Sequence, residues 1–165
     1  MQSQEVSQRH AASAPAEEEV NAIALLKSQH REVEALFGEL EDAGARAVKK
    51  KKKLFESVAE KLTLHTKLEE SIFYPEAKEA DEDLVLESLE EHANVKSMIR
   101  KLQRTEADDE TFDAKISVLK ELVQHHVSEE ENELFPKCQE ALGTEALEEL
   151  GKKMKNKQTH LEARH

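Results

Sequence analysis

Apolar residues recur along the chain at spacings of three and four, which places each set on one face of an α-helix. Four such stripes follow one another, and their apolar members are Ile23, Leu26, Val33, Phe37 and Leu40; Val48, Phe55, Val58 and Leu62; Val85, Leu89, Val95 and Ile99; and Phe112, Ile116, Leu119 and Val123. We expect Pro75 and Pro136 to end the second and fourth helices, because proline cannot donate to the helical ladder. Four helices with short connections predict an all-α fold, an antiparallel up-down-up-down four-helix bundle.

The two ends of the chain depart from this pattern. The first 19 residues are polar and rich in Ser, Gln and Ala, so we expect a disordered tail rather than an export signal. After Gly143, Thr144 can cap a short fifth helix that carries Leu147 and Leu150 on its apolar side. The predicted organisation is a disordered tail at 1–19, the bundle at 20–142, and a short C-terminal helix with a tail at 143–165.

Composition agrees with a helical protein and limits its partners. With 4 Gly, 3 Pro and no Trp, the chain lacks the turn and aromatic residues of an all-β fold. A net charge of −12 argues against nucleic acid as a partner. No stretch approaches the roughly 20 apolar residues of a membrane span, so we expect a cytoplasmic protein without membrane contact. The single cysteine excludes a disulfide framework and a cysteine-rich zinc site.

The chain also repeats itself. Residues 64–75 and 125–136 align at an offset of 61, and both contain His-x-x-x-Glu followed six residues later by proline. The helices before them align at an offset of 62, which pairs His30 with His92. The sequence therefore predicts two similar helical hairpins that pack with approximate two-fold symmetry.

Each apolar stripe carries a histidine where an apolar residue is expected. Side chains four residues apart point the same way on a helix, so each His-x-x-x-Glu pair faces the interior as a unit. The predicted metal ligands are His30, His65, Glu69, His92, His126 and Glu130. Two unpaired buried carboxylates would be very costly, and metal ions held among the four imidazoles remove that cost.

This donor set predicts a site for two metal ions. Imidazole with carboxylate suits iron, manganese or zinc, and a set without thiolates has no preference for soft metals. Each metal would receive two histidines and one oxygen from each bridging carboxylate, and a bridging oxide or hydroxide would add a fifth ligand. The sixth position stays open, which indicates small-molecule chemistry rather than a purely structural role.

An alternative register has to be weighed, because His125 and Glu129 have the same spacing as His126 and Glu130. The repeat favours His126, which lies ten residues before the following proline, as the corresponding histidine of the first half does. We expect His125 to face an adjacent helix or solvent. The nearby acids that we expect on the solvated surface are Glu34, Glu70, Glu129 and Glu131. Of these, Glu34 is also a candidate terminal ligand, because it follows His30 by four.

The sequence resembles the hemerythrin-like, or HHE cation-binding, domain of bacterial proteins. The resemblance extends from about Val20 to Met154 and rests on His30, on His65-x-x-x-Glu69 followed by Phe-Tyr-Pro, on His92, and on His126-x-x-x-Glu130 followed by Leu-Phe-Pro. It implies a non-haem di-iron centre, two Fe ions that are oxo- or hydroxo-bridged, with Zn or Mn less suited. By this resemblance the first two histidines bind one iron and the last two bind the other, while both glutamates bridge.

Two features depart from the oxygen-carrying hemerythrins. Those proteins place a fifth histidine one turn after the third-helix histidine, where this chain has Lys96. They also place the last bridging carboxylate five residues after its histidine, where this chain has Glu130 four residues after His126. Both departures weigh against reversible O2 carriage. They favour the bacterial HHE proteins that are associated with NO or peroxide handling and iron-centre repair.

The resemblance therefore predicts a di-iron protein that reacts with or binds O2, NO or H2O2, in oxidative or nitrosative stress or in iron homeostasis. The alternative is a non-catalytic sensor of O2, NO or iron, or an iron carrier. A metal-free structural bundle is the third hypothesis, and the paired His/Glu repeats weigh against it. The expected partner is a small-molecule ligand, and the sequence identifies neither a reaction nor a protein partner.

Overall fold

The computed structural model describes residues 21–164, and every regular element in this range is a helix. The elements are α1 (Ala22–Asp42), α2 (Val48–Leu68), η1 (Glu69–Phe73), α3 (Tyr74–Ala77), α4 (Glu82–Gln103), α5 (Phe112–Glu129), η2 (Glu130–Leu134) and α6 (Phe135–Glu162), where η denotes a π-helical segment. The predicted all-α class is confirmed. The predicted disordered tail at 1–19 lies outside the described residues.

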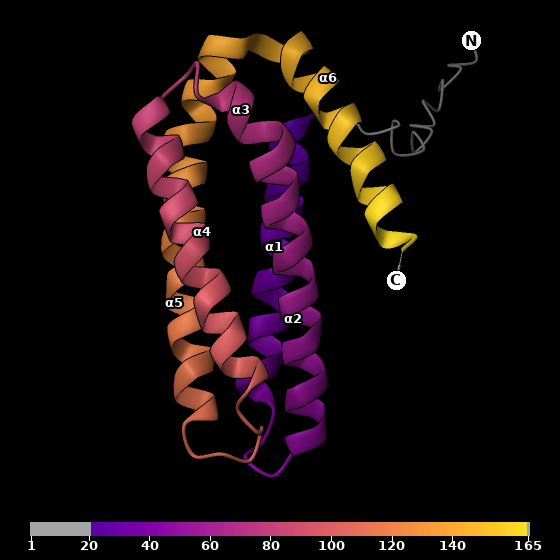
Figure 1. Ribbon diagram of the computed structural model, residues 1–165, viewed down its shortest axis with the longest axis vertical. Coiled ribbons are helices and arrows are strands. Elements are labelled where there is room, and N and C mark those ends of the chain that lie inside the picture. Colours follow the sequence, from indigo (N-terminus) through magenta and orange to yellow (C-terminus); the bar gives the residue numbers. More distant parts are fainter. Residues whose placement is uncertain (1–20, 165) are drawn as a thin grey trace, which may run out of the picture.

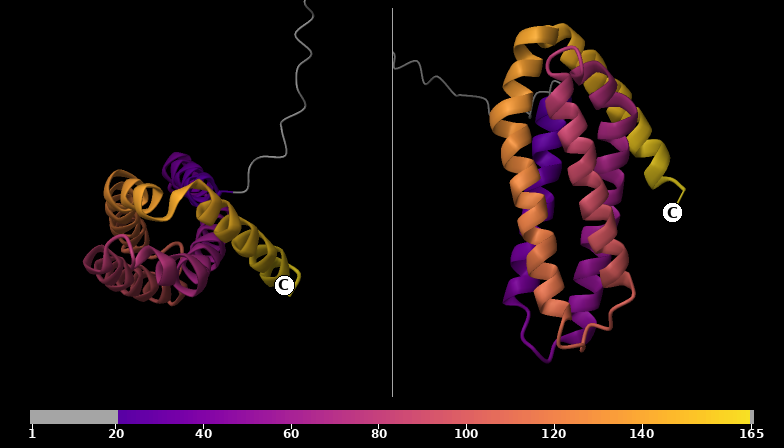
Figure 2. Two further views of the ribbon diagram at one scale, coloured as in Figure 1. Left: turned by 90° about the horizontal axis from the view of Figure 1, so that it is seen from above. Right: turned by 60° about the vertical axis from the view of Figure 1, so that its left-hand side comes forward.

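The helices α1, α2, α4 and α5 form an antiparallel bundle (Figure 1). Helices α1 and α4 run in one direction, and α2 and α5 run in the other. The closest packing is between α1 and α2 and between α4 and α5, as the two predicted hairpins require. A view from above shows the four helices arranged around one shared axis, with α6 to one side (Figure 2).

Helices α1 and α4 begin at side-chain caps. The Asn21 side-chain oxygen accepts hydrogen bonds from the backbone N–H groups of Ile23 (2.9 Å) and Ala24 (3.4 Å). An oxygen of Asp81 accepts from the backbone N–H of Leu84 at 3.0 Å. These bonds satisfy donors that have no partner in the first turn of a helix. Each hairpin therefore has a defined starting point.

Helices α2 and α5 each pass into a π-helical turn, and the two turns begin at Glu69 and Glu130. The predicted helix ends at Pro75 and Pro136 are wrong, since the chain stays helical beyond each proline. Each proline lies at the start of the next α-helix, where its missing N–H is tolerated. A π turn holds about one residue more than an α turn. The side chains that follow are therefore rotated, which helps to turn Tyr74 into the interior.

The core consists of two apolar clusters with a polar layer between them. One cluster lies toward the connections α1–α2 and α4–α5, and contains Val33, Phe37, Phe55, Leu62, Val95, Phe112 and Val123 among others. The other lies toward α3 and α6, and contains Leu26, Leu68, Phe73, Val85, Leu134, Phe135 and Leu147 among others. On α1, α2 and α4 the predicted ligand histidine lies between buried residues of the two clusters. The polar layer is thus closed by apolar side chains at both ends.

Helix α6 is longer than the short C-terminal helix that the sequence predicts. Gly143 (φ 80°, ψ 169°) bends it sharply, and the segment beyond continues to Glu162. That segment crosses the end of the bundle and runs back along α1 and α2 (Figure 1). Leu147, Leu150 and Met154 are buried in this contact. The extension was missed because the lysine-rich stretch after Leu150 has no regular apolar stripe.

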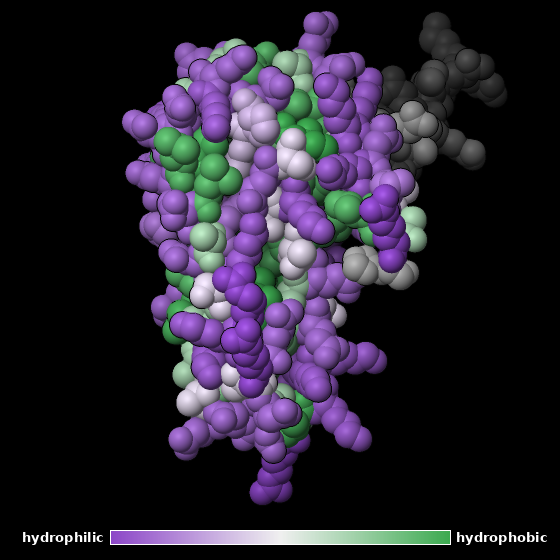
Figure 3. All heavy atoms as spheres, in the orientation of Figure 1, coloured by the Kyte–Doolittle hydropathy of each residue, from purple (hydrophilic) through white to green (hydrophobic). Residues whose placement is uncertain are grey.

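Hydrophilic side chains cover most of the face seen in Figure 3. Among the described residues, the only large apolar side chains that are exposed are Leu86 and Val118. Within the same range, no helix combines the length and the apolar content that crossing a bilayer requires.

The bend at Gly143 yields a prediction about stability. A residue with a Cβ is strained at this positive φ, so Gly143→Ala should lower the free energy of unfolding by about 1–3 kcal/mol. Gly38→Ala is the matched control, because Gly38 lies within α1 and a Cβ there would meet no atom within 4 Å. The control should be neutral or stabilising by up to about 1 kcal/mol. Urea unfolding of both variants measures this, and equal stability of Gly143→Ala and the unmodified chain would contradict it.

Candidate metal centre

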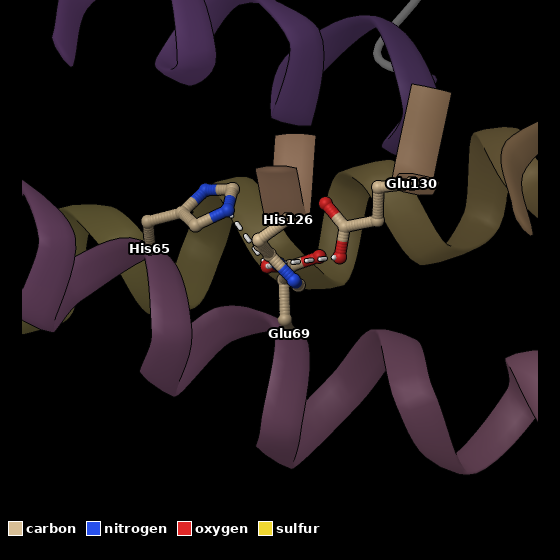
Figure 4. Close-up of side chains that lie close together, drawn as sticks. All are labelled: His65, Glu69, His126 and Glu130. Carbon is tan, nitrogen blue, oxygen red and sulfur yellow. Dashed lines mark ion pairs between the residues drawn. The ribbon is translucent and has the colours of Figure 1, made fainter. Parts of the chain in front are cut away.

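The structure brings all six predicted ligand residues together in the polar layer. They come from α1, α2, η1, α4, α5 and η2, and each is at most 5% exposed. Ligand atoms of His65, Glu69, His126 and Glu130 lie within 4.8 Å of one another. Figure 4 shows these four side chains pointing toward one another from two helices. The i,i+4 spacing and the repeat thus identified side chains that the fold brings together.

Glu130 lies between the two halves of the site. Its Oε1 is 3.1 Å from Nε2 of His30, and its Oε2 is 3.1 Å from Nε2 of His126. One carboxylate therefore faces one histidine from each hairpin, as a bridging ligand must.

Glu69 makes a similar connection from the opposite side. Its Oε1 is 2.7 Å from Nε2 of His65 and 3.3 Å from Nε2 of His92. These histidines again belong to different hairpins. The two carboxylates together connect all four imidazoles.

Several atoms in this layer have no hydrogen-bond partner although they are fully buried. They are Nε2 of His30, Nε2 of His65, both carboxylate oxygens of Glu69, and Oε1 of Glu130. The close His–Glu approaches fall within ion-pair distance, but their geometry does not form hydrogen bonds. Unpaired nitrogen and oxygen atoms that converge in a closed interior are the donor set of a metal site. The residues present therefore fit bound metal ions.

The outer nitrogen of each histidine is held by a side chain on another helix. Nδ1 of His30 bonds Glu131 at 2.8 Å, and Nδ1 of His65 bonds Gln29 at 2.7 Å. In the second hairpin, Nδ1 of His92 bonds Glu70 and Nδ1 of His126 bonds Glu91, both at 3.0 Å. An Nδ1–H that donates outward leaves the Nε2 lone pair directed inward, which is how metal-binding histidines are oriented.

Sequence reasoning missed these outer partners. Glu70 and Glu131 were expected on the solvated surface, yet they hold histidines and are only 30% and 16% exposed at the side chain. The repeat contained the signal, because Glu70 and Glu131 are 61 residues apart, and Gln29 and Glu91 are 62 apart. These are the same offsets that relate the ligands themselves.

Two of the outer carboxylates also pair with a cation. Both oxygens of Glu70 accept from Nζ of Lys96, at 2.9 and 2.8 Å. Arg31 pairs with Glu131. Lys96 therefore neutralises an outer partner of His92 and does not enter the site. Glu34 also stays outside, since it pairs with Arg31 at the surface.

His125 and His126 point in different directions. The side chain of His126 is 6% exposed and lies in the site, while that of His125 is 69% exposed. The register chosen from the repeat is the one that the helix adopts.

Protons balance the charge of the layer when no cation is bound. Burial lowers the pKa of His126, but the adjacent Glu130 carboxylate outweighs burial and holds that pKa well above its usual value. The pKa of His30 is raised for the same reason, since burial is outweighed by Glu130 and Glu69. Burial would raise the pKa of the Glu69 carboxyl, yet the charge of His65 and its other neighbours hold it well below the usual value. Glu69 is thus favoured as a carboxylate, and His30 and His126 hold a proton more readily than a free imidazole does.

Tyr74 makes the two ends of the site different. Its hydroxyl donates a hydrogen bond to Oε2 of Glu130 at 2.5 Å and lies 3.1 Å from Nε2 of His92. Burial, together with the charge of Glu130, raises the pKa of this phenol well above its usual value, so it remains a proton donor. The equivalent residue of the repeat is Phe135, which stacks on His30 with 6.0 Å between ring centroids.

Comparisons with known proteins agree with this arrangement. Residues 21–138 match the model of the hemerythrin HHE cation binding domain. A crystal structure of a hemerythrin HHE cation binding domain-containing protein from Mycobacterium kansasii is similar, with a TM-score of 0.75 and 26% identity over 85% of this chain and 86% of that one. A protein from Nostoc sp. described as a DNA nickase is 23% identical over 148 residues, which are 89% of this chain but 42% of that protein. The chain thus spans less than half the length of that curated relative.

The family match covers most of the sequence, and the buried His/Glu cluster fits a metal site. The chain belongs to the hemerythrin HHE cation-binding family.

Proposed function

We propose that this protein holds a non-haem di-iron centre that reacts with or binds O2, NO or H2O2. The observation that carries the proposal is the layer of four imidazole Nε2 atoms arranged around two buried carboxylates. His30 and His65 would hold one iron, and His92 and His126 the other. Glu69 and Glu130 would bridge, which their positions between the hairpins support.

Iron suits this donor set better than zinc or manganese. Sites of histidine and carboxylate with open positions are typical of non-haem iron, whereas structural zinc sites are four-coordinate and closed. With two imidazoles and two carboxylate oxygens, each ion would keep positions free. Lys96 stands where oxygen-carrying hemerythrins place a further histidine, and it pairs with Glu70 instead. An open centre therefore fits a reactive role better than reversible O2 carriage.

When bound, the iron pair would supply open coordination positions and electrons for a small ligand. The chain supplies the surroundings. Tyr74 Oη carries a proton next to Glu130 and is placed to donate to a ligand at the His92–His126 end. The apolar clusters on both sides of the layer exclude water and so strengthen this hydrogen bond.

Metal content tests the proposal directly. Protein purified from iron-replete cells should hold about two iron ions per chain, as di-metal sites in bundle cores do. His65→Ala and Glu130→Ala should each lower the iron content to about one ion or fewer while the circular dichroism stays helical. His160→Ala, which removes an exposed histidine outside the layer, is the matched control and should keep full iron content. Unmodified protein without iron, or variants with unchanged iron, would refute the centre.

Rapid mixing of the reconstituted protein with H2O2, NO or O2 tests the reactive role. We expect turnover of peroxide or NO, which absorption spectra and product analysis would measure. A stable O2 or NO adduct without turnover would support the alternative, a non-catalytic sensor or carrier.

Tyr74→Phe should fold and hold iron normally, because phenylalanine occupies the equivalent place in the repeat. It should slow the reaction and alter its pH profile, and an unchanged rate and profile would remove Tyr74 from the proposal.

Metal uptake should release protons. The pKa values of His30 and His126 lie above their usual value in the metal-free chain, so these imidazoles carry protons that a metal ion has to displace. The affinity for metal should therefore rise with pH through and above 6.5, the usual pKa of histidine, and about two protons should be released per chain near that pH. Calorimetry of metal binding in buffers of different ionisation enthalpy counts these protons. A proton count of zero would contradict the charge balance described above.

A further inference from the structure

A second group of metal-binding side chains lies on the surface, outside the interior centre. It consists of Glu91 on α4 and of His125 and Glu129 on α5, and one ligand atom of each lies within 4.8 Å of the others. Nε2 of His125 is 3.4 Å from Oε2 of Glu91 and 3.3 Å from Oε1 of Glu129. The side chain of His125 is 69% exposed, so the group is open to solvent.

Among the described residues, Glu91 lacks the neighbouring Lys or Arg that the other outer carboxylates, Glu131 and Glu70, have. The outer carboxylates of His30 and His92 are matched by Arg31 and Lys96. Glu91, which holds Nδ1 of His126 through Oε1, has no such cation: no Lys or Arg among residues 21–164 forms an ion pair with it. Oε2 of Glu91 faces the imidazole of His125, which also faces the carboxylate of Glu129. A positive charge at this point would complete the pattern that the other two positions show.

The repeat shows that the bundle itself does not require a histidine at position 125 or a carboxylate at position 129. The counterparts of Glu91, His125 and Glu129 in the first hairpin are Gln29, Leu64 and Leu68. That face is covered by α6, where a side-chain amide of Gln29 lies 3.5 Å from Gln158 and Leu68 is fully buried.

The corresponding face of α4 and α5 is not covered by α6. Its surface hollow is lined by Glu91, His125 and Glu129 together with Leu86 and Leu89. The three polar residues therefore occur only in the hairpin where the position is accessible. Glu91 has a structural role, since it holds Nδ1 of His126, but packing gives no such role to His125 or Glu129, whose counterparts are apolar.

We propose that Glu91, His125 and Glu129 form a surface site for a divalent cation, distinct from the interior centre. The two sites are connected through Glu91, which also holds Nδ1 of His126. One imidazole and two carboxylates suit Zn²⁺, Fe²⁺ or Mn²⁺, and three side chains leave positions for water. A bound cation supplies the positive charge that Glu91 lacks. It also draws electron density from Glu91 and so weakens the support that this residue gives to His126.

Calorimetric titration of the purified full-length chain with Zn²⁺ tests the site, with iron content measured before and after. The chain should bind one Zn²⁺ beyond the interior centre. His125→Gln and Glu129→Gln should each weaken that binding at least about tenfold, the order of loss that follows removal of even an outer partner of a metal ligand. Both residues are exposed or nearly so, and both variants should retain the helical circular dichroism and iron content of the unmodified chain.

His160→Gln is the matched control, because it removes an exposed histidine that has no paired carboxylates at this site, and its zinc binding should be unchanged. The proposal is overturned if the unmodified chain binds no zinc except in exchange for iron. It is equally overturned if His125→Gln and Glu129→Gln bind zinc as the unmodified chain does. If the unmodified chain held no iron, only the interior proposal would be refuted. The surface proposal would still be tested, because zinc binding by each variant is compared with zinc binding by the unmodified chain.

Discussion

Two carboxylates and four imidazoles share one layer in the middle of an otherwise apolar core, and their mutual charge balance is the constraint on which the structure depends. Buried carboxylates without positive charge beside them are very unfavourable. Neighbouring carboxylates outweigh burial and raise the pKa values of His30 and His126, so protons on these two imidazoles contribute positive charge when no cation is present. Because metal ions and protons compete for the same nitrogen atoms, fold stability and cation binding are linked in this protein.

Two kinds of feature determine the geometry of the layer: the partners of the histidine Nδ1 atoms, and the π turns η1 and η2. Each Nδ1 atom is fixed by a partner on a different helix, so the orientation of the imidazoles depends on how the helices pack within and between the hairpins. The π turns η1 and η2 begin at the two carboxylate residues and redirect the chain that follows. The first of them helps to bring the hydroxyl of Tyr74 to Glu130, and the second is followed by Phe135 against His30. A nearly symmetric scaffold thus carries an asymmetric site.

The bundle and the six interior side chains could be predicted from periodicity and from the internal repeat, since both depend on local helix geometry. Glu70 and Glu131 were misplaced because a charged residue next to a ligand looks the same in sequence whether it faces solvent or an imidazole. The hydrogen bond from Tyr74 to Glu130 could not be predicted, because no apolar pattern indicates the extra residue of a π turn. The length of α6 was underestimated since a few apolar residues, Met154 among them, suffice when a helix packs on only one side.

The central claim is that the polar layer holds two iron ions. X-ray data collected on crystals of the purified protein above and below the iron absorption edge test it most directly. The account predicts two anomalous peaks in the layer, one about 2.1 Å from Nε2 of His30 and His65 and the other at the same distance from Nε2 of His92 and His126. Both peaks should contact Glu69 and Glu130. An empty layer in protein from iron-replete cells, or a single peak away from these nitrogen atoms, would contradict it.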